Sequence, residues 1–143
     1  MKKLTFDNGL QEVRIGGGVL RFNPQDPNLF VRFEQAGEKL RAVEADMVSK
    51  ARSVGEDSNQ VARILHDGDR QMKQILDWVF GAGNDFDAIL QGVNLLAVAG
   101  NGERVVTNLF AALEPVLVEG AKGCAQARTA AAAAKAQNRR AVQ

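Results

Sequence analysis

The sequence predicts an α+β fold that is mainly α. We expect a small N-terminal β-hairpin or sheet packed on a helical hairpin, followed by a C-terminal helix. Two observations predict it. The first 22 residues alternate polar with apolar side chains and carry glycine at the turns, whereas apolar residues recur every three or four positions on both sides of Gly55.

The β element is expected in residues 1–23. The stretches KLTF, QEVRI and VLRF alternate in polarity, which predicts three short strands. Asn8-Gly9 is typical of a tight hairpin turn, and Gly16 to Gly18 interrupt the next two stretches. The segment NPQDPN then ends the sheet, because proline cannot donate to a strand ladder.

The helical hairpin is expected in residues 28–80, as one helix over 28–54 and another over 57–80. Apolar residues from Leu29 to Val54 and from Val61 to Val79 recur every three or four positions between charged ones. Gly55 to Ser58 combine a helix stop with N-cap residues for the second helix.

Residues 80–100, which we call the elbow, interrupt this pattern with glycines, an Asn-Asp pair and two short apolar runs. One short helix, DFDAIL, is expected there, capped by Asn84 or Asp85. A last helix is expected from about residue 102, with a kink at Pro115. Residues 84–119 thus hold the rest of the elbow and the last helix, and they complete a single domain over 1–120.

Residues 121–143 form an alanine-rich, basic tail. Alanine favours helix, but the tail lacks an apolar face, so we expect it to be helical only marginally or when docked. The net charge of the chain is +1, and the residues after Glu119 carry +5, so the first 119 residues carry −4. No aromatic residue accompanies these cations, which favours a solvated tail over nucleic-acid binding, although both interpretations stay open.

Composition indicates a soluble intracellular protein. Met1-Lys2-Lys3 is not followed by the apolar run of a signal peptide, and no apolar stretch has the ~18–20 residues needed to span a bilayer. The single cysteine, Cys124, excludes an internal disulfide. We therefore expect no membrane contact.

The residues that carry chemistry are few. Gly81-Ala82-Gly83 follows a helix and lacks the GK[ST] of a phosphate loop, and Asn84, Asp85 and Asp87 lack the spacing of a calcium loop. The only histidine, His66, has no cysteine or second histidine near it in the sequence. We therefore predict no catalytic residue, cofactor or metal, and expect a protein that is not an enzyme.

A family resemblance begins in the elbow. The stretch ILDWVFGAGNDFDAILQGVNLLAVAGNGERVVTNLFAALEPVLVEG resembles the tail assembly chaperones of long-tailed bacteriophages (siphophages and their prophages). In that family a small β element and a helical hairpin precede an F-G-x-G stretch, a short D-x-I-F/L helix and an asparagine-bearing apolar segment. The matching residues here are Phe80, Gly81, Gly83, Asp87, Ile89, Leu90 and Asn94. The openings LTF…VRIGGGVLRFNP and FVRFEQAGEKL are similar in layout, so the resemblance covers about residues 1–120.

The resemblance implies a non-enzymatic protein of the host cytoplasm that coats the apolar, helical tape measure protein during tail assembly. Such proteins leave as tail tube subunits polymerise, so the tail tube protein is a further possible partner, and many copies are used, which implies a homo-oligomer. The alternatives are a structural tail component retained in the virion and a small nucleic-acid-binding module that uses the basic tail.

The apolar residues of the elbow and the last helix form the hypothetical protein-binding face. Its members are Phe86, Ile89, Leu90, Leu95, Leu96, Leu109 and Phe110. Gly81 and Gly83 are interpreted as a hinge, because glycine tolerates backbone conformations that other residues avoid. The competing interpretation is that the same seven residues form the domain's own core.

Overall fold

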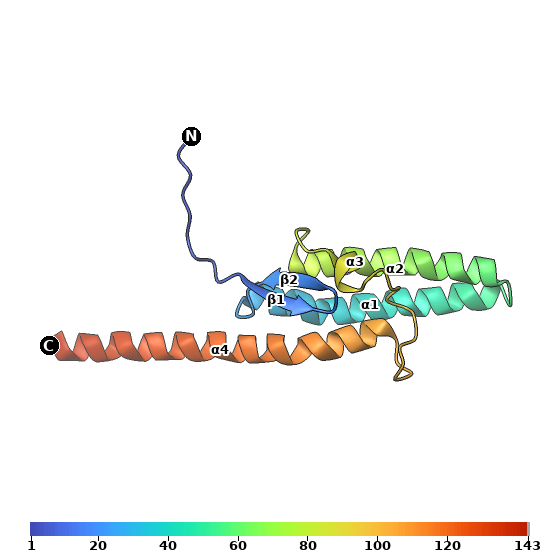
Figure 1. Ribbon diagram of the computed structural model, residues 1–143. Helices are drawn as coiled ribbons and strands as arrows, with labels where there is room; N and C mark the ends of the chain where they lie inside the picture. The colour runs from blue at the N-terminus through green and yellow to red at the C-terminus, as the bar shows by residue number, and fades with distance from the viewer. Residues whose placement is uncertain (143) are drawn as a thin grey trace.

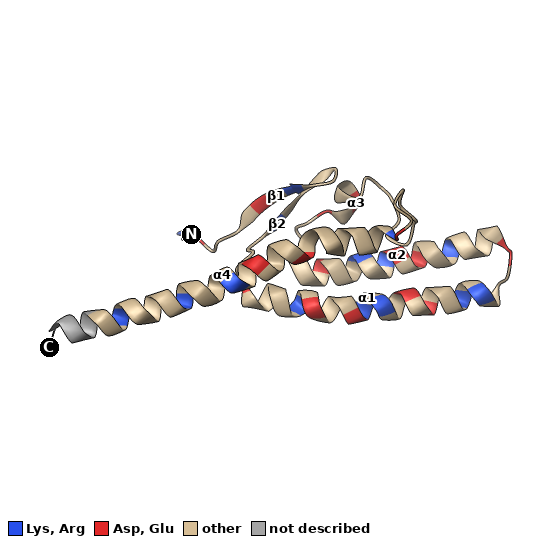
Figure 2. Ribbon diagram, turned by 90° about the horizontal axis from the view of Figure 1, so that it is seen from below, with Lys and Arg blue, Asp and Glu red and all other residues tan. Residues whose placement is uncertain are grey.

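The computed structural model describes the backbone of residues 1–142 and the side chains of residues 1–137. Its elements are β1 (Gln11–Ile15), β2 (Gly18–Phe22), α1 (Pro27–Ser53), α2 (Ser58–Phe80), α3 (Phe86–Ile89) and α4 (Val105–Val142). In Figure 1, α1 lies between α2 and α4, and Figure 2 shows the β-hairpin and α3 on one side of the long helices. The predicted fold class, α+β and mainly α, is confirmed.

The sheet has two strands rather than the three predicted. β1 and β2 are antiparallel, in a register that runs from Gln11 opposite Phe22 to Ile15 opposite Gly18. Gly16 and Gly17 form the turn, and Gly16 has a φ of 54°. The KLTF stretch is not a strand and pairs with no strand among residues 1–142, so the prediction of a hairpin turn at Asn8-Gly9 is wrong.

The helical hairpin begins and ends within one residue of its predicted bounds. Asp26 caps α1 by accepting a hydrogen bond from the Asn28 N–H, and Asp57 caps α2 by accepting one from the Gln60 N–H. Gly55 has a φ of 66° in the connection, as expected of a residue just past a helix end. Short polar caps therefore set both helix starts.

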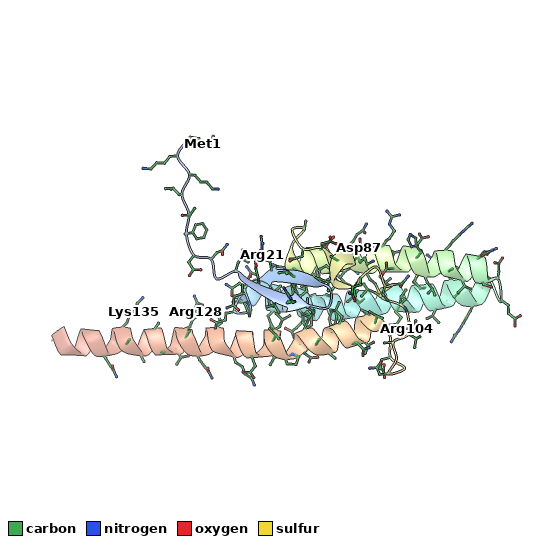
Figure 3. The ribbon with its side chains drawn as sticks, viewed as in Figure 1. Met1, Arg21, Asp87, Arg104, Arg128 and Lys135 are labelled. Atoms are coloured by element: carbon green, nitrogen blue, oxygen red, sulfur yellow. The ribbon has the colours of Figure 1, made fainter. Side chains whose placement is uncertain are left out.

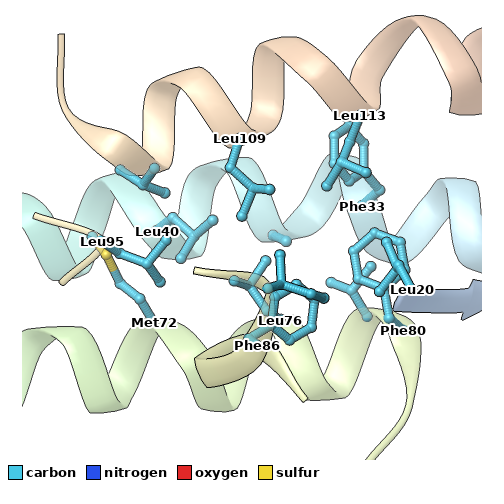
Figure 4. Packing of buried hydrophobic residues seen from close by; sticks show 14 of the residues in the cluster. Leu20, Phe33, Leu40, Met72, Leu76, Phe80, Phe86, Leu95, Leu109 and Leu113 are labelled. Atoms are coloured by element: carbon cyan, nitrogen blue, oxygen red, sulfur yellow. The ribbon is translucent and has the colours of Figure 1, made fainter. Parts of the chain in front are cut away.

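The core lies where the long helices, β2 and α3 meet (Figure 4). Its helix α1 and α2 members are Leu29, Phe33, Ala36, Leu40, Met47, Met72, Leu76, Val79 and Phe80, and the β-hairpin adds Leu20 and Phe22. The helical members of this core follow the spacing of three to four residues that predicts the inner faces of α1 and α2.

Helix α4 starts three residues later than predicted, and it continues through Pro115, where a kink is predicted. Pro115 is exposed, so water can reach the carbonyl group that its missing N–H leaves without a partner. The helix also continues through the alanine-rich tail to Val142, and residues 125–137 are exposed along their whole length (Figure 1). Residues 125–137 of the tail are thus helical without being docked on the rest of the described chain, which differs from the expectation of a helix that is marginal or docked.

Candidate protein-binding surface

The elbow begins with a sharp helix end and a second cap. Gly81 ends α2 with a φ of 97°, and its N–H donates to the Asp77 carbonyl at 2.7 Å. Asp85 then caps α3 by accepting from the Ala88 N–H at 3.1 Å. Of the two predicted caps, Asp85 is the N-cap of α3, and Asn84 has a different role.

The Asn84 side chain binds the outer edge of β2 in the way that a neighbouring strand would. Its Oδ1 accepts from the Arg21 N–H at 2.7 Å, and its Nδ2 donates to the Arg21 carbonyl at 3.1 Å. The same Nδ2 lies 3.0 Å from the carbonyl oxygen of Phe80 at the end of α2. One amide therefore joins β2 to α2. The sequence gives no sign of this contact, because the two partners are 63 residues apart.

A charged cluster fastens the elbow to α2. Lys73 Nζ donates to Asp69 Oδ2 at 2.7 Å and to Asp87 Oδ1 at 2.6 Å. Asp69 is buried, and its other oxygen accepts from the Leu95 N–H at 2.8 Å. Burial acts to lower the pKa of Lys73, but its hydrogen bonds and attraction to the two carboxylates outweigh burial, so the pKa is raised above 10.5.

The carboxylates at this end of α2 also repel one another. Partial burial raises the pKa of Asp77, and the negative charges of Asp87 and Asp85 raise it further. Asp69 has both of its oxygens in hydrogen bonds and Asp87 is paired with Lys73. Within residues 1–142, no three His, Cys, Asp or Glu side chains lie close enough together to hold a metal ion.

Hydrogen bonds and one ion pair join the second part of the elbow, together with Arg104 just after it, to all three long helices. Asn94 Nδ2 donates to the Leu65 carbonyl of α2 at 3.1 Å. Arg104 Nη1 donates to the Leu96 carbonyl at 2.7 Å, and its Nε lies 2.7 Å from Glu44 Oε1 of α1. The Val106 N–H of α4 donates to the Leu95 carbonyl at 2.9 Å. The elbow therefore sets the position at which α4 begins.

Most of the predicted binding residues face inward. Five of the seven are buried, with 0–7% of their surface exposed: Phe86, Ile89, Leu95, Leu96 and Leu109. Leu90 and Phe110 are half-buried at the edge of the core. In this structure the five buried residues contact the domain itself and are out of reach of a partner. Only Leu90 and Phe110 remain accessible from outside.

The two predicted hinge glycines differ. Gly81 has the positive φ that favours glycine, whereas Gly83 does not. A Cβ added at either position would meet no atom within 4 Å. The hinge itself stays a prediction, and hydrogen bonds hold both sides of Gly81.

Phe110 borders a groove between α1 and α4. Its ring stacks on Phe33 of α1, with centroids 4.4 Å apart and planes 14° from parallel. The groove has a volume of about 340 Å³. Its lining residues are Gly37, Leu40, Arg41, Glu44, Val106, Thr107, Phe110, Ala111 and Glu114. The floor is therefore apolar and the rim carries charges of both signs.

A second groove lies between α1 and α2 and was not predicted. Its volume is about 290 Å³, and Val43, Ile75 and Trp78 supply its apolar part. Trp78 is 42% exposed, and Lys39 Nζ lies 3.9 Å from its ring centroid. The sequence contains a sign of this groove. Trp78 lies between Leu76 and Val79 but outside their apolar stripe, which places a large aromatic side chain off the inner face of α2.

Of the other residues considered for chemistry, His66 lines an open hollow of about 410 Å³ together with Asp69, Lys73 and Asp87, and Cys124 lies elsewhere on α4. His66 is exposed on α2, and Cys124 is half-buried on α4 as a free thiol. No helix in the described part of the chain has both the length and the apolar character required to cross a membrane.

Comparison with protein-family models, with curated proteins and with solved structures found no match.

Proposed function

We propose that the protein is a non-enzymatic tail assembly chaperone of a long-tailed bacteriophage, which binds the tape measure protein in the host cytoplasm. The order of residues in the elbow, from Phe80 to Asn94, supports this proposal through its resemblance to that family. The tail tube protein is a second possible partner, because it displaces such chaperones in that family.

The groove between α1 and α4 is the observation that carries the proposal. A tape measure protein offers long amphipathic helices, and such a helix docks by laying its apolar face into an apolar groove. Leu40, Val106 and Phe110 form such a floor here. Arg41, Glu44 and Glu114 at the rim match the polar flanks of a bound helix.

The predicted protein-binding face is therefore reduced to the side of α4 that lines this groove. Phe110 keeps its proposed role as an anchor, because it is half-buried beside the groove. Gly37 and Ala111 contribute little side-chain bulk, which leaves the groove open. The five buried residues belong to the core and do not line the groove, so they do not contact the client in this proposal.

The test blocks the groove without disturbing the core. Ala111 lines the groove and is exposed, whereas its neighbour Ala112 is exposed and does not line it. We expect Ala111→Arg to abolish co-purification with co-expressed tape measure fragments, and Ala112→Arg to retain it. Both variants should melt at the wild-type temperature, because exposed helix positions change stability by only about ±0.5 kcal/mol.

Two other results would contradict the proposal. Equal binding by both variants would show that the client does not bind in the groove between α1 and α4. Stoichiometric amounts of the protein in purified virions, measured by mass spectrometry, would favour a structural component of the tail over a chaperone that departs.

A nucleic-acid-binding function is the second candidate. It is favoured by the exposed part of α4, where Lys122, Arg128 and Lys135 occur with no acidic residue (Figure 2). Backbone binding to DNA depends steeply on salt. Retention on DNA that falls with salt, and that is lost when these three residues are changed to glutamine, would support this candidate.

A further inference from the structure

The N-terminal arm, residues 1–6, stands away from the rest of the molecule (Figures 1 and 3). Leu4 is 81% exposed and Phe6 is 84% exposed. Both belong to the KLTF stretch, whose alternating polarity is typical of a strand with one buried face. The chain thus carries a strand-like segment whose apolar side chains are exposed to solvent.

The turn after the arm directs it away from the domain's own sheet. Asp7 Oδ1 accepts from the Gly9 N–H at 2.8 Å, and Asn8 Oδ1 accepts from the Leu10 N–H at 3.2 Å. Asn23 Nδ2 also donates to the Asn8 carbonyl at 3.0 Å, which fastens this turn beside the end of β2. The arm therefore leaves the turn without folding back along β1.

The sheet has one closed edge and one open edge. Asn84 binds both the N–H and the C=O of Arg21, so these groups of β2 point away from β1. Glu12 pairs with Arg21, and in an antiparallel ladder its own N–H and C=O must then point outward on the other side. The same holds for Arg14, two residues further along β1. Within the described residues, no hydrogen bond occupies this outer edge.

We propose that residues 3–6 of one copy add to the free edge of β1 in a second copy as a third strand. Strand addition of this kind is driven by main-chain hydrogen bonds, and pockets for alternate side chains give it specificity. Both the strand and the edge are present in every copy, so no other protein is required. The contact is independent of the client groove between α1 and α4.

The side chains of the arm match the two faces of the sheet. Val13 and Ile15 point to the core side and are half-buried, because β1 is an edge strand. Leu4 and Phe6 have the same alternation and extend this apolar face when aligned with it. Lys3 then lies on the outer face with Glu12, whose side chain is 60% exposed and pairs with Arg21 at 2.6 Å. Arg14 and Arg21 lie on that same face, so the apolar alternation, and not charge, carries the match.

The test uses variants of the full chain that remove either the strand or the edge. Leu4→Ser/Phe6→Ser removes the apolar face of the arm, with Thr5→Ser as its matched control. Arg14→Pro removes an outward N–H of β1 and leaves the ladder with β2 intact, because proline is tolerated where the N–H is not used. Melting temperatures are measured for every variant to confirm that each one folds.

Light scattering across a wide concentration range then gives the oligomeric state. We expect the wild type and Thr5→Ser to associate as concentration rises, and the arm and edge variants to remain monomeric. A synthetic peptide of residues 1–9 should dissociate the wild type, whereas the same peptide with serine for Leu4 and Phe6 should not. Association that persists in both variants would place the contact elsewhere and overturn the proposal.

Hydrogen exchange of residues 3–6 separates the other outcomes. Strand addition between copies predicts protection that increases with protein concentration. A wild-type monomer with a protected arm at every concentration would show that the arm folds onto its own β1. A monomer with an unprotected arm would show that the edge stays empty. Either result overturns the proposal.

Discussion

Helix α4 has two segments that are continuous in backbone but held in different ways. The packed segment, residues 105–120, buries one side chain per turn against α1 and the elbow: Val106, Leu109, Leu113 and Leu117. The projecting segment, residues 125–137, is exposed throughout and consists mainly of alanine (Figure 2). Packing places the first segment, whereas the second is supported by backbone hydrogen bonds, by the intrinsic preference of alanine and by the Thr129 hydroxyl, which donates to the Ala125 carbonyl at 3.0 Å.

The comparison shows that helix formation and helix placement have separate causes. Alanine loses little side-chain entropy in a helix, so it continues a helix that packing has already started. It contributes no side chain large enough to hold that helix against a neighbour. Substitutions in the two segments should therefore affect different observables.

The largest effect is expected in the packed segment. Leu117 is 1% exposed, and Leu117→Ala should lower the free energy of unfolding by about 2–5 kcal/mol, because it leaves a cavity in the core. Val116→Ala is the control, since Val116 is 40% exposed on the other side of the same turn. Urea denaturation of both variants measures the difference. Equal losses would show that α4 is not packed by this face.

The next effect concerns the elbow that positions the start of the packed segment. Lys73→Met leaves Asp69 buried without its cation and should cost about 1.5–3 kcal/mol at neutral pH. Because folding raises the pKa of Lys73, its contribution is complete below pH 10.5 and is lost as pH rises through the folded-state value.

Lys50→Met is the matched control, because Lys50 pairs with Asp46 at 3.0 Å on an exposed surface. It should cost no more than about 1 kcal/mol. Thermal melts at pH 7 and at alkaline pH compare the two. A loss in Lys73→Met as small as that in the control would mean that the charged cluster does not fasten the elbow.

A smaller effect is expected where the packed segment ends. Gly120 is buried against the Pro24 carbonyl, and an added Cβ would overlap that oxygen. Gly120→Ala should therefore destabilise the protein by about 1–3 kcal/mol, because backbone has to move. At Gly123 a Cβ would meet only the end of the Gln25 side chain, 3.0 Å away. Gly123→Ala should be neutral or stabilising, and the melting temperatures of the pair should move apart.

The smallest effect on global stability is expected in the projecting segment. Ala132→Gly should weaken the helix locally by about 1 kcal/mol, because glycine is the poorer helix former. The melting temperature of the domain should not change, whereas the helical signal in circular dichroism should fall. A lower melting temperature would show that residue 132 contributes to the folded core after all.

The sequence predicted the helical hairpin to within a residue because its information is local. Regular apolar spacing defines the inner faces, and Asp57 or Asp85 can cap a helix only through N–H groups two or three residues away. The α3 helix and the stop at Gly81 were predicted for the same reason. Each depends on residues that are close neighbours in the chain.

The errors concern contacts between distant residues. KLTF has the alternation of a strand, but alternation does not say which edge the strand meets, and no edge in the described part of the chain receives it. The apolar bulk of the elbow did not reveal that Leu95 and Phe86 turn inward. That orientation depends on Asp69 and Asn84, whose partners lie 26 and 63 residues away.

The side chain of Asn84 also limits how many neighbours each sheet can accept. Because this amide occupies the outer groups of β2 at Arg21 and Ile89 of α3 lies against Gly18, the β1 edge is the one that receives the incoming strand in the proposed assembly. Each copy then has one donor and one acceptor, which in the terms of polymer chemistry makes it a bifunctional monomer. Such units close into pairs or rings or grow as unbranched chains, and they cannot cross-link into a network. In the proposed assembly, Asn84 and α3 together thus limit each molecule to one incoming strand.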